Sequence, residues 1–294
     1  MWLTANIKGI KAVTLATPQA TLEVVKKFGL RLEKSLGQHF LIDQNILNKI
    51  VSSAYLSKSD VVVEIGPGIG TLTQSLAQRA GRVIAIELDR KLKPVLEYTL
   101  AGYDNVSVIF TDALSANLRH FPERLPIPNK LVSNLPYQIA TPLLATYLDN
   151  FSELSLYVIM VQKEVADRII AKPSTSEYGS FSVKVQFYCD VERVANISRN
   201  VFIPPPEVNS AIVRMKRLPE PRVHVLNRDF FFKVVKAAFW QRRKTIRNAL
   251  LGSPELKINA ERVGSALISC KIDSSRRGET LSIDEFSCLA NALW

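Results

Sequence analysis

From Val61 to Val161 the chain alternates short, continuously apolar segments with longer segments of helical periodicity. The apolar segments are predicted strands at residues 61–65, 82–88, 106–111, 130–133 and 156–161. Neighbouring positions within each strand are apolar, so both faces are expected to be buried, which is typical of a parallel sheet covered by helices. The pattern therefore predicts an α/β fold built on a parallel sheet.

Helices are expected before and between these strands. Thr17 and Pro18 are typical of a helix N-terminus and Gly29 of its end, and a basic, loop-like piece follows over 30–43. Further helices are expected over 44–54, 71–79 and 164–170, and after Pro142.

The character of the chain changes after the prolines at 219 and 221. Beyond them only helices are expected, at 229–250, 259–269 and 282–293. Before them, 210–215 is predicted as a late strand, whereas 181–187 fits a strand or a helix equally well. We therefore divide the chain into a basic lead over 1–34, a main domain over 35–217 and a small all-α domain over 218–294.

A glycine-rich turn, Gly66-Pro-Gly68-Ile-Gly70, joins the first strand to its helix. Glycine lets the backbone turn tightly and approach a ligand, and this GxGxG spacing differs from the GxGxxG of dinucleotide sites. Glu87 ends the second strand, where a carboxylate can bind two ribose hydroxyls, and Asp112 follows the third, where it can meet an adenine amino group. The three features predict a site for an adenosine-containing cofactor.

The motif Asn134-Leu135-Pro136-Tyr137 follows the fourth strand. The N6 nitrogen of adenine is a poor nucleophile because its lone pair is delocalised into the ring. The side-chain oxygen of Asn134 and the backbone carbonyl of Leu135 can accept its two hydrogens, which makes the lone pair more available. Tyr137 offers a ring face to a flipped base. Phe202, in a proline-rich segment, is a candidate for the other face, although a loop packed on the core fits equally well.

The chain carries 38 Lys and Arg against 27 Asp and Glu, a net charge of +11 that favours a polyanionic partner. The surplus lies in the flanks: residues 1–60 hold 8 basic and 4 acidic residues, and residues 220–294 hold 13 and 8. We interpret Cys189, Cys270 and Cys288 as reduced residues of a cytoplasmic protein, because they form no CxxC pattern. The histidines are scattered, so no metal site is expected, and no apolar stretch approaches a membrane span.

The chain resembles the KsgA family of small-subunit rRNA adenine dimethyltransferases from about residue 18 to the end. The motifs that carry the resemblance are KSLGQHFLID at 34–43, EIGPGIGTLT at 64–73, IELD at 86–89, TDAL at 111–114, NLPYQIATPLL at 134–144, VQKEVADRI at 161–169, FIPPPEVNSAIV at 202–213 and AAFWQRRKTIRNAL at 237–250.

The resemblance implies a Rossmann-like class I methyltransferase domain with a small C-terminal all-α domain. It implies S-adenosylmethionine as methyl donor, without a metal, and dimethylation at N6 of two adjacent adenosines near the 3′ end of small-subunit rRNA. The expected substrate is a pre-30S particle in ribosome biogenesis, and the enzyme is expected to be cytoplasmic and monomeric. By motif, the cofactor-binding residues are His39, Leu41, Gly66, Glu87, Asp112 and Asn134, with Gly68 and Gly70 from the same turn.

A basic cluster on the helix expected at 229–250 is the predicted RNA contact. Arg243 and Arg247 are four residues apart, so they would share one helical face. The residues just before them, 237–239, are expected to pack on the main domain. We expect the cluster to bind phosphates; a solvated basic face is the alternative. Its members are Arg242, Arg243, Lys244 and Arg247.

Three other functions fit parts of the sequence. An erythromycin-resistance methylase acting on large-subunit rRNA shares the fold and the chemistry. A DNA N6-adenine methylase typically carries an acidic residue in place of Asn134. A non-catalytic ribosome-assembly or transcription factor would not need an intact Asn-Leu-Pro-Tyr motif and glycine turn.

Overall fold

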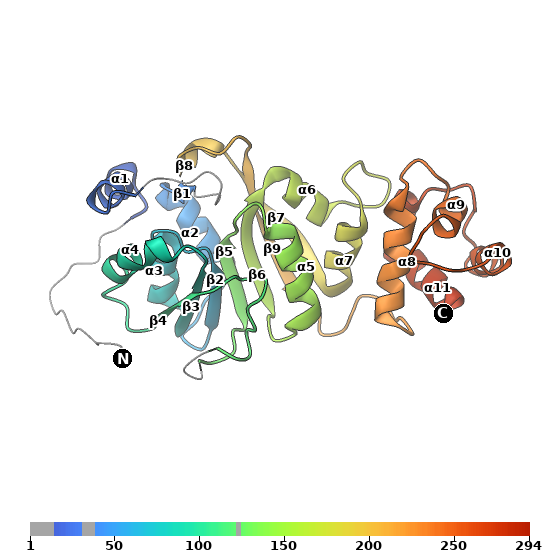
Figure 1. Cartoon of the computed structure of the whole chain (residues 1–294), viewed down its shortest axis with the longest axis horizontal. Helices are drawn as coiled ribbons and strands as arrows, with labels where there is room; N and C mark the ends of the chain where they lie inside the picture. Colours follow the sequence, from blue (N-terminus) through green and yellow to red (C-terminus); the bar gives the residue numbers. More distant parts are fainter. Residues whose placement is uncertain (1–14, 31–38, 122–124) are drawn as a thin grey trace. The chain divides into compact units, whose positions relative to one another are not determined.

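The computed structural model describes residues 15–30, 39–121 and 125–294. The predicted N-terminal lead, 1–34, is therefore described only over 15–30. The chain forms two compact units, which are drawn in Figure 1. The first contains Met1–Ala166 and Glu192–Lys216, and the second contains Asp167–Val191 and Arg217–Trp294. The chain thus enters the second unit twice, and the division into domains at 34/35 and 217/218 stays a prediction.

A seven-stranded mixed sheet runs through the first unit (Figure 1). Its strands are β2 (Val61–Ile65), β3 (Arg82–Glu87), β4 (Val106–Phe110), β5 (Lys130–Asn134), β6 (Leu156–Gln162), β7 (Cys189–Ile197) and β9 (Ser210–Arg217). Their order is β4-β3-β2-β5-β6-β9-β7, with parallel pairing from β4 to β6 and β9 antiparallel to β6. The five predicted parallel strands and the late strand are confirmed. The strand order reverses between β2 and β5, which is where such sheets bind ligands.

Helices accompany this sheet along the chain. They are α1 (Pro18–Lys27), α2 (Gln44–Ser53), α3 (Thr71–Arg79), α4 (Lys93–Thr99), α5 (Ala140–Asn150) and α6 (Lys163–Ile170), with short 3-10 turns η2 (Arg90–Leu92) and η4 (Arg199–Val201). As predicted, Thr17 caps α1, and its hydroxyl accepts the N–H of Ala20. Val62 and Val83 are partners in register and pack in one core with Ile50 of α2 and Leu76 of α3. Burying these side chains removes apolar area from water and fixes the strand register.

A two-stranded antiparallel ribbon lies outside the large sheet. Its strands are β1 (Phe40–Leu41) and β8 (Phe202–Ile203), with Phe40 opposite Ile203 and Leu41 opposite Phe202. We expected β1 to be loop, because two residues are too few to show a strand period. The ribbon joins the segment before α2 to the proline-rich segment before β9.

The second unit is helical. Its elements are α7 (Ser180–Tyr188), α8 (Arg228–Trp240), α9 (Ile246–Leu251), η5 (Gly278–Thr280), α10 (Ala260–Ser269) and α11 (Ile283–Leu293). Segment 181–187, which fitted either structure, is therefore helix. The ring of Phe239 packs against Tyr178 and Phe286, both of the same unit.

The single helix predicted over 229–250 is wrong, because α8 ends at Trp240 and α9 begins at Ile246. Gln241 leaves the helical backbone region, with φ −132° and ψ 85°. Thr245 then caps α9 by accepting the N–H of Asn248. Arg243 therefore lies in a turn and Arg247 in α9, so the expectation that they share one helical face is also wrong.

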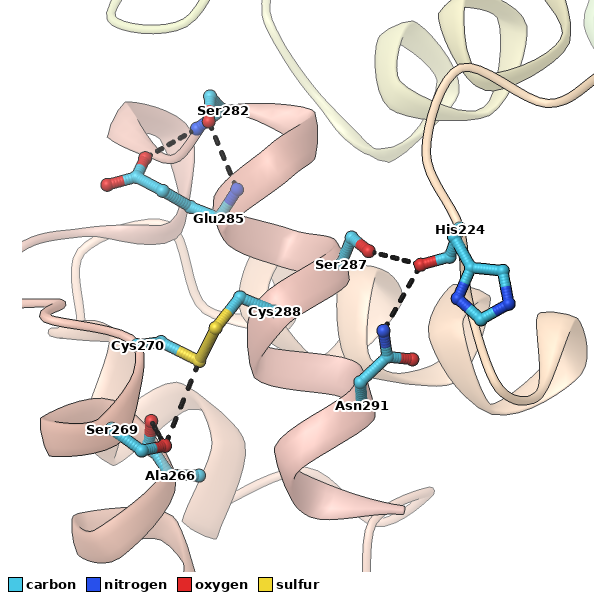
Figure 2. Close-up of a disulfide and its surroundings, with 9 residues drawn as sticks. All are labelled: His224, Ala266, Ser269, Cys270, Ser282, Glu285, Ser287, Cys288 and Asn291. Atoms are coloured by element: carbon cyan, nitrogen blue, oxygen red, sulfur yellow. Dashed lines mark hydrogen bonds between the residues drawn. A yellow bond between two sulfur atoms is a disulfide. The ribbon is translucent and has the colours of Figure 1, made fainter.

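A disulfide joins Cys270, at the end of α10, to Cys288 in α11 (Figure 2). Our interpretation of these two cysteines as reduced is wrong. Their Cα atoms lie 5.8 Å apart, a separation that sequence spacing cannot reveal. Cys189 is a free, buried thiol, as expected, and burial raises its pKa to about 12. Figure 2 also shows how Ser287 and Asn291 of α11 donate to the backbone carbonyl of His224.

Candidate active site

A pocket in the first unit lies at the carboxyl ends of β2, β3, β4 and β5, where the strand order reverses. The predicted site residues that line it are His39, Leu41, Gly66, Gly68, Glu87, Asp112, Asn134, Leu135 and Tyr137. Gly70 instead caps α3 in the left-handed conformation, with φ +92°. Residues at the ends of four separate strands and on the ribbon therefore meet in one pocket, as predicted from their positions at the carboxyl ends of the strands.

The glycine turn lets two other motifs approach the end of β2. Gly66 and Gly68 have φ of +68° and +59°, values that side-chain-bearing residues rarely adopt. A Cβ atom on Gly66 would stand 3.0 Å from Pro136 Cγ, and one on Gly68 would stand 3.0 Å from the Phe40 ring. The absence of side chains at these positions is what allows the Asn-Leu-Pro-Tyr turn and β1 to close on the pocket.

Glu87 and Asp112 present carboxylates from the ends of β3 and β4. Asp89 donates its backbone N–H to Glu87 Oε1 at 2.8 Å. Burial raises the pKa of Glu87, and backbone N–H groups, including that of Gly68, oppose the rise. Leu114 donates its N–H to Asp112 Oδ1 at 2.9 Å, which fixes that side chain at the pocket. Both acids are held by the backbone.

Glu64 is a site residue to which we gave no role from the sequence. It lies in β2, lines the pocket and is only 2% exposed. Burial raises its pKa to about 8, and the Glu87 carboxylate adds to the rise. Its Oε2 atom has no hydrogen-bond partner among the described residues. The available signal was an acid inside an otherwise apolar strand, since such a group is unfavourable unless a partner compensates it.

Asn134 is the last residue of β5, and its amide is oriented by His39, the residue just before the ribbon. Its Nδ2 donates to the backbone carbonyl of His39 at 3.5 Å, so the Oδ1 atom faces the other way. That oxygen is buried and has no hydrogen-bond partner among the described residues. Leu135 donates its N–H to Met160 on β6, which anchors the turn. The site therefore holds a fixed acceptor that awaits a donor.

Tyr137 is held by two contacts. Its hydroxyl shares a 2.7 Å hydrogen bond with Ser210 Oγ at the start of β9, and Ser210 is fully buried. Burial raises the pKa of Tyr137, so the phenol stays neutral. Its ring lies 5.8 Å from the His39 ring at an interplanar angle of 28°. The Nδ1–H of His39 donates to the carbonyl of Pro204 at 2.7 Å, because a carbonyl can only accept.

Of the two interpretations given for Phe202, a base-stacking face or packing on the core, the structure supports the second. The Phe202 side chain is 2% exposed, belongs to the hydrophobic core and does not line the pocket. The reason is its place in the β1–β8 ribbon, where alternate side chains face opposite sides: Phe202 faces the core and Ile203 is only half-buried. The structure thus contradicts a stacking role for Phe202 in this arrangement.

The basic cluster of the second unit divides into anchored and unpaired members. Arg242 donates to Glu279, and also to the carbonyl of Ser176 at 2.8 Å. Within the described parts of the chain, no ion pair engages Arg243, Lys244 or Arg247. Arg242 therefore fastens the turn, and the other three cations are available to a ligand.

The pocket lies where the strand order reverses, and the glycine turn, Glu87 and Asp112 line it. This arrangement is that of a Rossmann-like methyltransferase with a site for a nucleoside-containing cofactor. The described residues contain no group of three or more His, Cys, Asp or Glu side chains placed to hold a metal ion.

Comparison with known proteins places the chain within this class. The family model described as ribosomal RNA adenine dimethylase matches residues 29–290. A ribosomal RNA small subunit methyltransferase A from Bacillus cytotoxicus is 46% identical over 95% of this chain and 97% of its own, and one from Bacillus mycoides is 48% identical with the same coverage. The chain belongs to the ribosomal RNA adenine dimethylase family.

Two solved structures share the fold. A dimethyladenosine transferase from Plasmodium falciparum has a TM-score of 0.72 and 27% identity, covering 85% of this chain and 96% of its own. The 23S rRNA methyltransferase ErmE has a TM-score of 0.65 and 28% identity, covering 86% and 99%. The predicted Rossmann-like fold with a C-terminal helical region is confirmed.

Proposed function

We propose that this chain transfers methyl groups from S-adenosylmethionine to N6 of two adjacent adenosines near the 3′ end of small-subunit rRNA. Family membership supports rRNA adenine dimethylation. The observation that carries the chemistry is the buried, unpaired Oδ1 of Asn134 at the pocket. A buried acceptor without a donor is unfavourable by about 1–3 kcal/mol, so a ligand that supplies N–H groups fits this site.

The pocket residues suit the methyl donor group by group. Glu87 would accept hydrogen bonds from the ribose hydroxyls, and Asp112 from the adenine amino group. Glu64, whose Oε2 atom lacks a partner, would pair with the ammonium of the methionine part. Leu41 of the ribbon and His39, which precedes it, would cover the donor. When bound, S-adenosylmethionine supplies an electrophilic methyl group on a sulfonium centre.

The chain's own residues would activate the target nitrogen. Asn134 Oδ1 and the Leu135 carbonyl accept the two N6 hydrogens and hold the amine. The Tyr137 ring, fixed through Ser210, provides a face for the flipped base. No strong general base is required, because the amine becomes acidic as it acquires positive charge.

The small ribosomal subunit is favoured over the large one by similarity. The two relatives named for the small subunit are 46% and 48% identical to this chain, whereas the 23S rRNA methyltransferase is 28% identical. We further propose a pre-30S particle as substrate, and a monomeric enzyme in the cytoplasm. Among the described residues, no helix has the length and apolar character needed to cross a membrane.

The helical unit would hold rRNA by its phosphates. Arg243, Lys244 and Arg247 offer unpaired cations, which bind phosphate without reading sequence. Arg242, which we also expected to bind RNA, would act by holding the turn through Glu279.

A methylation assay with three substrates tests the proposal. The full chain and isotopically labelled S-adenosylmethionine are incubated with small subunits lacking dimethyladenosine, with large subunits and with duplex DNA. Mass mapping of the rRNA should find four methyl groups on two adjacent adenosines near the 3′ end of the small-subunit RNA. Incorporation confined to large-subunit RNA or to DNA would overturn the substrate assignment, and no incorporation into any of them would overturn the activity.

A further inference from the structure

Trp240 is a large aromatic side chain that the helical unit leaves in solvent. It is the last residue of α8, and 56% of it is exposed. The same helix buries Phe231 completely and packs Phe239 against two other rings. In the described structure no aromatic ring or cation lies against the Trp240 indole. Core packing therefore does not account for a tryptophan here.

The turn that follows Trp240 is wholly exposed and basic. Residues 241–244 are all exposed, and a hydrogen bond from Lys244 N–H to the Gln241 carbonyl closes the turn. Arg242 ties it to Glu279, whereas the charged groups of Arg243 and Lys244 have no ion-pair partner among the described residues. In the chain, an exposed indole thus directly precedes a fixed turn that carries two available cations.

We propose that Trp240 and this basic turn form a binding site for unpaired RNA, in which a base stacks on the indole and Arg243 and Lys244 contact the flanking phosphates. The inference rests on the proposed rRNA function and adds a second kind of contact to it. A positive surface selects a polyanion, and an aromatic face beside it selects a polyanion with accessible bases. Bases inside a duplex are stacked on both faces and only the two end pairs offer a free face, so single-stranded or looped RNA is the partner that fits.

The chain offers a matched control on the same unit. Trp294 is also exposed, at 60%, but its ring packs against Phe230. The full chain contains three tryptophans, so a variant carrying Trp2→Phe and Trp294→Phe reports on Trp240 alone. Trp240→Phe keeps a ring of smaller area, and Trp240→Ala removes the ring without changing the charge.

Binding of a 12-nucleotide oligo(A) RNA and of a long RNA duplex, whose two ends are few relative to its phosphates, to the full chain tests the proposal. Trp240→Ala should weaken oligo(A) binding by roughly 5- to 150-fold, with Trp240→Phe intermediate and Trp294→Ala unchanged. The salt dependence should keep its slope in Trp240→Ala, whereas Arg243→Ala with Lys244→Ala should flatten it by about 0.7 per lost contact. Oligo(A) should quench the fluorescence of the single-tryptophan variant, and the duplex should not.

Two results would overturn the inference: wild-type affinity for oligo(A) in Trp240→Ala, or an equal loss for oligo(A) and duplex. Methylation of small-subunit rRNA by the same preparations separates this failure from a failure of the proposed function. If Trp240→Ala binds oligo(A) normally while the enzyme methylates rRNA, only the stacking site is lost. If the wild-type chain methylates no rRNA, the proposed function fails instead.

Discussion

The pocket of the first unit and the basic turn of the second unit present polar groups in opposite ways. In the pocket, Glu64 Oε2 and Asn134 Oδ1 are buried without a hydrogen-bond partner among the described residues. At the turn, Arg243 and Lys244 are exposed, and water and salt can satisfy them. Buried polar groups bind only a ligand whose own polar groups meet them at hydrogen-bond distance, whereas exposed cations bind any phosphate. The difference supports the proposed division of roles, with chemistry in the first region and RNA docking in the second.

Asn134→Ala should give the largest effect and separates the two regions most sharply. Methyl transfer in a single turnover should fall by roughly 100-fold or more, because the lost acceptor acts on the reacting amine. RNA affinity should stay nearly unchanged. Asn45→Ala, at an exposed asparagine of α2, is the control. Transfer by Asn134→Ala at the wild-type rate would show that the unpaired oxygen has no part in the chemistry.

Arg243→Ala combined with Arg247→Ala should produce the reverse pattern. Affinity for pre-30S particles should drop roughly tenfold near physiological salt, and the log–log salt slope should flatten by about 0.7–0.9 per contact. Calorimetric affinity for S-adenosylmethionine should not change. Lys257→Ala, an exposed lysine outside the turn, should retain the wild-type slope. An unaltered slope in the double variant would show that other residues bind the rRNA phosphates, and the predicted N-terminal lead would be the next candidate.

Glu87→Ala tests the ribose contact within the pocket. The variant should lose about 1–3 kcal/mol of affinity for S-adenosylmethionine or its demethylated product, the scale of hydrogen bonds to a charged group. Titration calorimetry measures it, and RNA binding should be unaffected. Equal affinity of variant and wild type would remove Glu87 from the cofactor site.

Glu64→Gln tests the buried acid through pH. The pKa near 8 means that the ligand-free protein holds Glu64 protonated at pH 7, so pairing with an ammonium should release a proton. The calorimetric binding enthalpy of wild type, but not of Glu64→Gln, should then change with the buffer. Because the folded pKa lies above the ordinary value, the stability contribution is full below about pH 4.5 and is lost as pH rises through 8. Without ligand, the Tm of Glu64→Gln should therefore be higher than that of wild type between pH 7 and 9.

Ser210→Ala should give the smallest effect, because Ser210 positions Tyr137 and touches no reacting atom. Losing this hydrogen bond should weaken RNA binding by about 1 kcal/mol. The KM for RNA should therefore rise, with little change in cofactor affinity. Ser210→Thr, which keeps a hydroxyl, should recover part of the loss. If Ser210→Ala lowers cofactor affinity as much as it raises KM, the residue is a packing element of the sheet instead.

The parts of the molecule set by strand periodicity were predictable. Consecutive apolar residues identified the five parallel strands, and the rule that ligands bind at strand ends brought Gly66, Glu87 and Asn134 together. We predicted no role for Glu64 because we read this acid of the first strand only as part of the glycine-turn motif. What the sequence could not show is that the Glu64 Oε2 atom has no partner among the described residues and that the Glu87 carboxylate is close enough to raise its pKa.

The parts set by contacts distant in sequence were not predictable. The β1–β8 ribbon joins segments more than 160 residues apart through two residues on each side, which leaves no period to detect. It also turns Phe202 into the core, the one of its two interpretations that the sequence could not select. The break after Trp240 contains neither Pro nor Gly, so only the Gln241 backbone and the Thr245 cap reveal it. The Cys270–Cys288 pair likewise depends on how two helices meet.

The unpaired Oδ1 of Asn134 also bears on how many methyl groups the site can add. An unmodified adenine amine brings two hydrogens to the two acceptors of the motif, a monomethylated amine brings one, and a dimethylated amine brings none. With the proposed chemistry, the second transfer would proceed with one of these two contacts, and the dimethylated base would again leave the buried oxygen without a donor. The motif would therefore hold the base less strongly after each transfer, and the dimethylated base, which offers no N–H group, would be released.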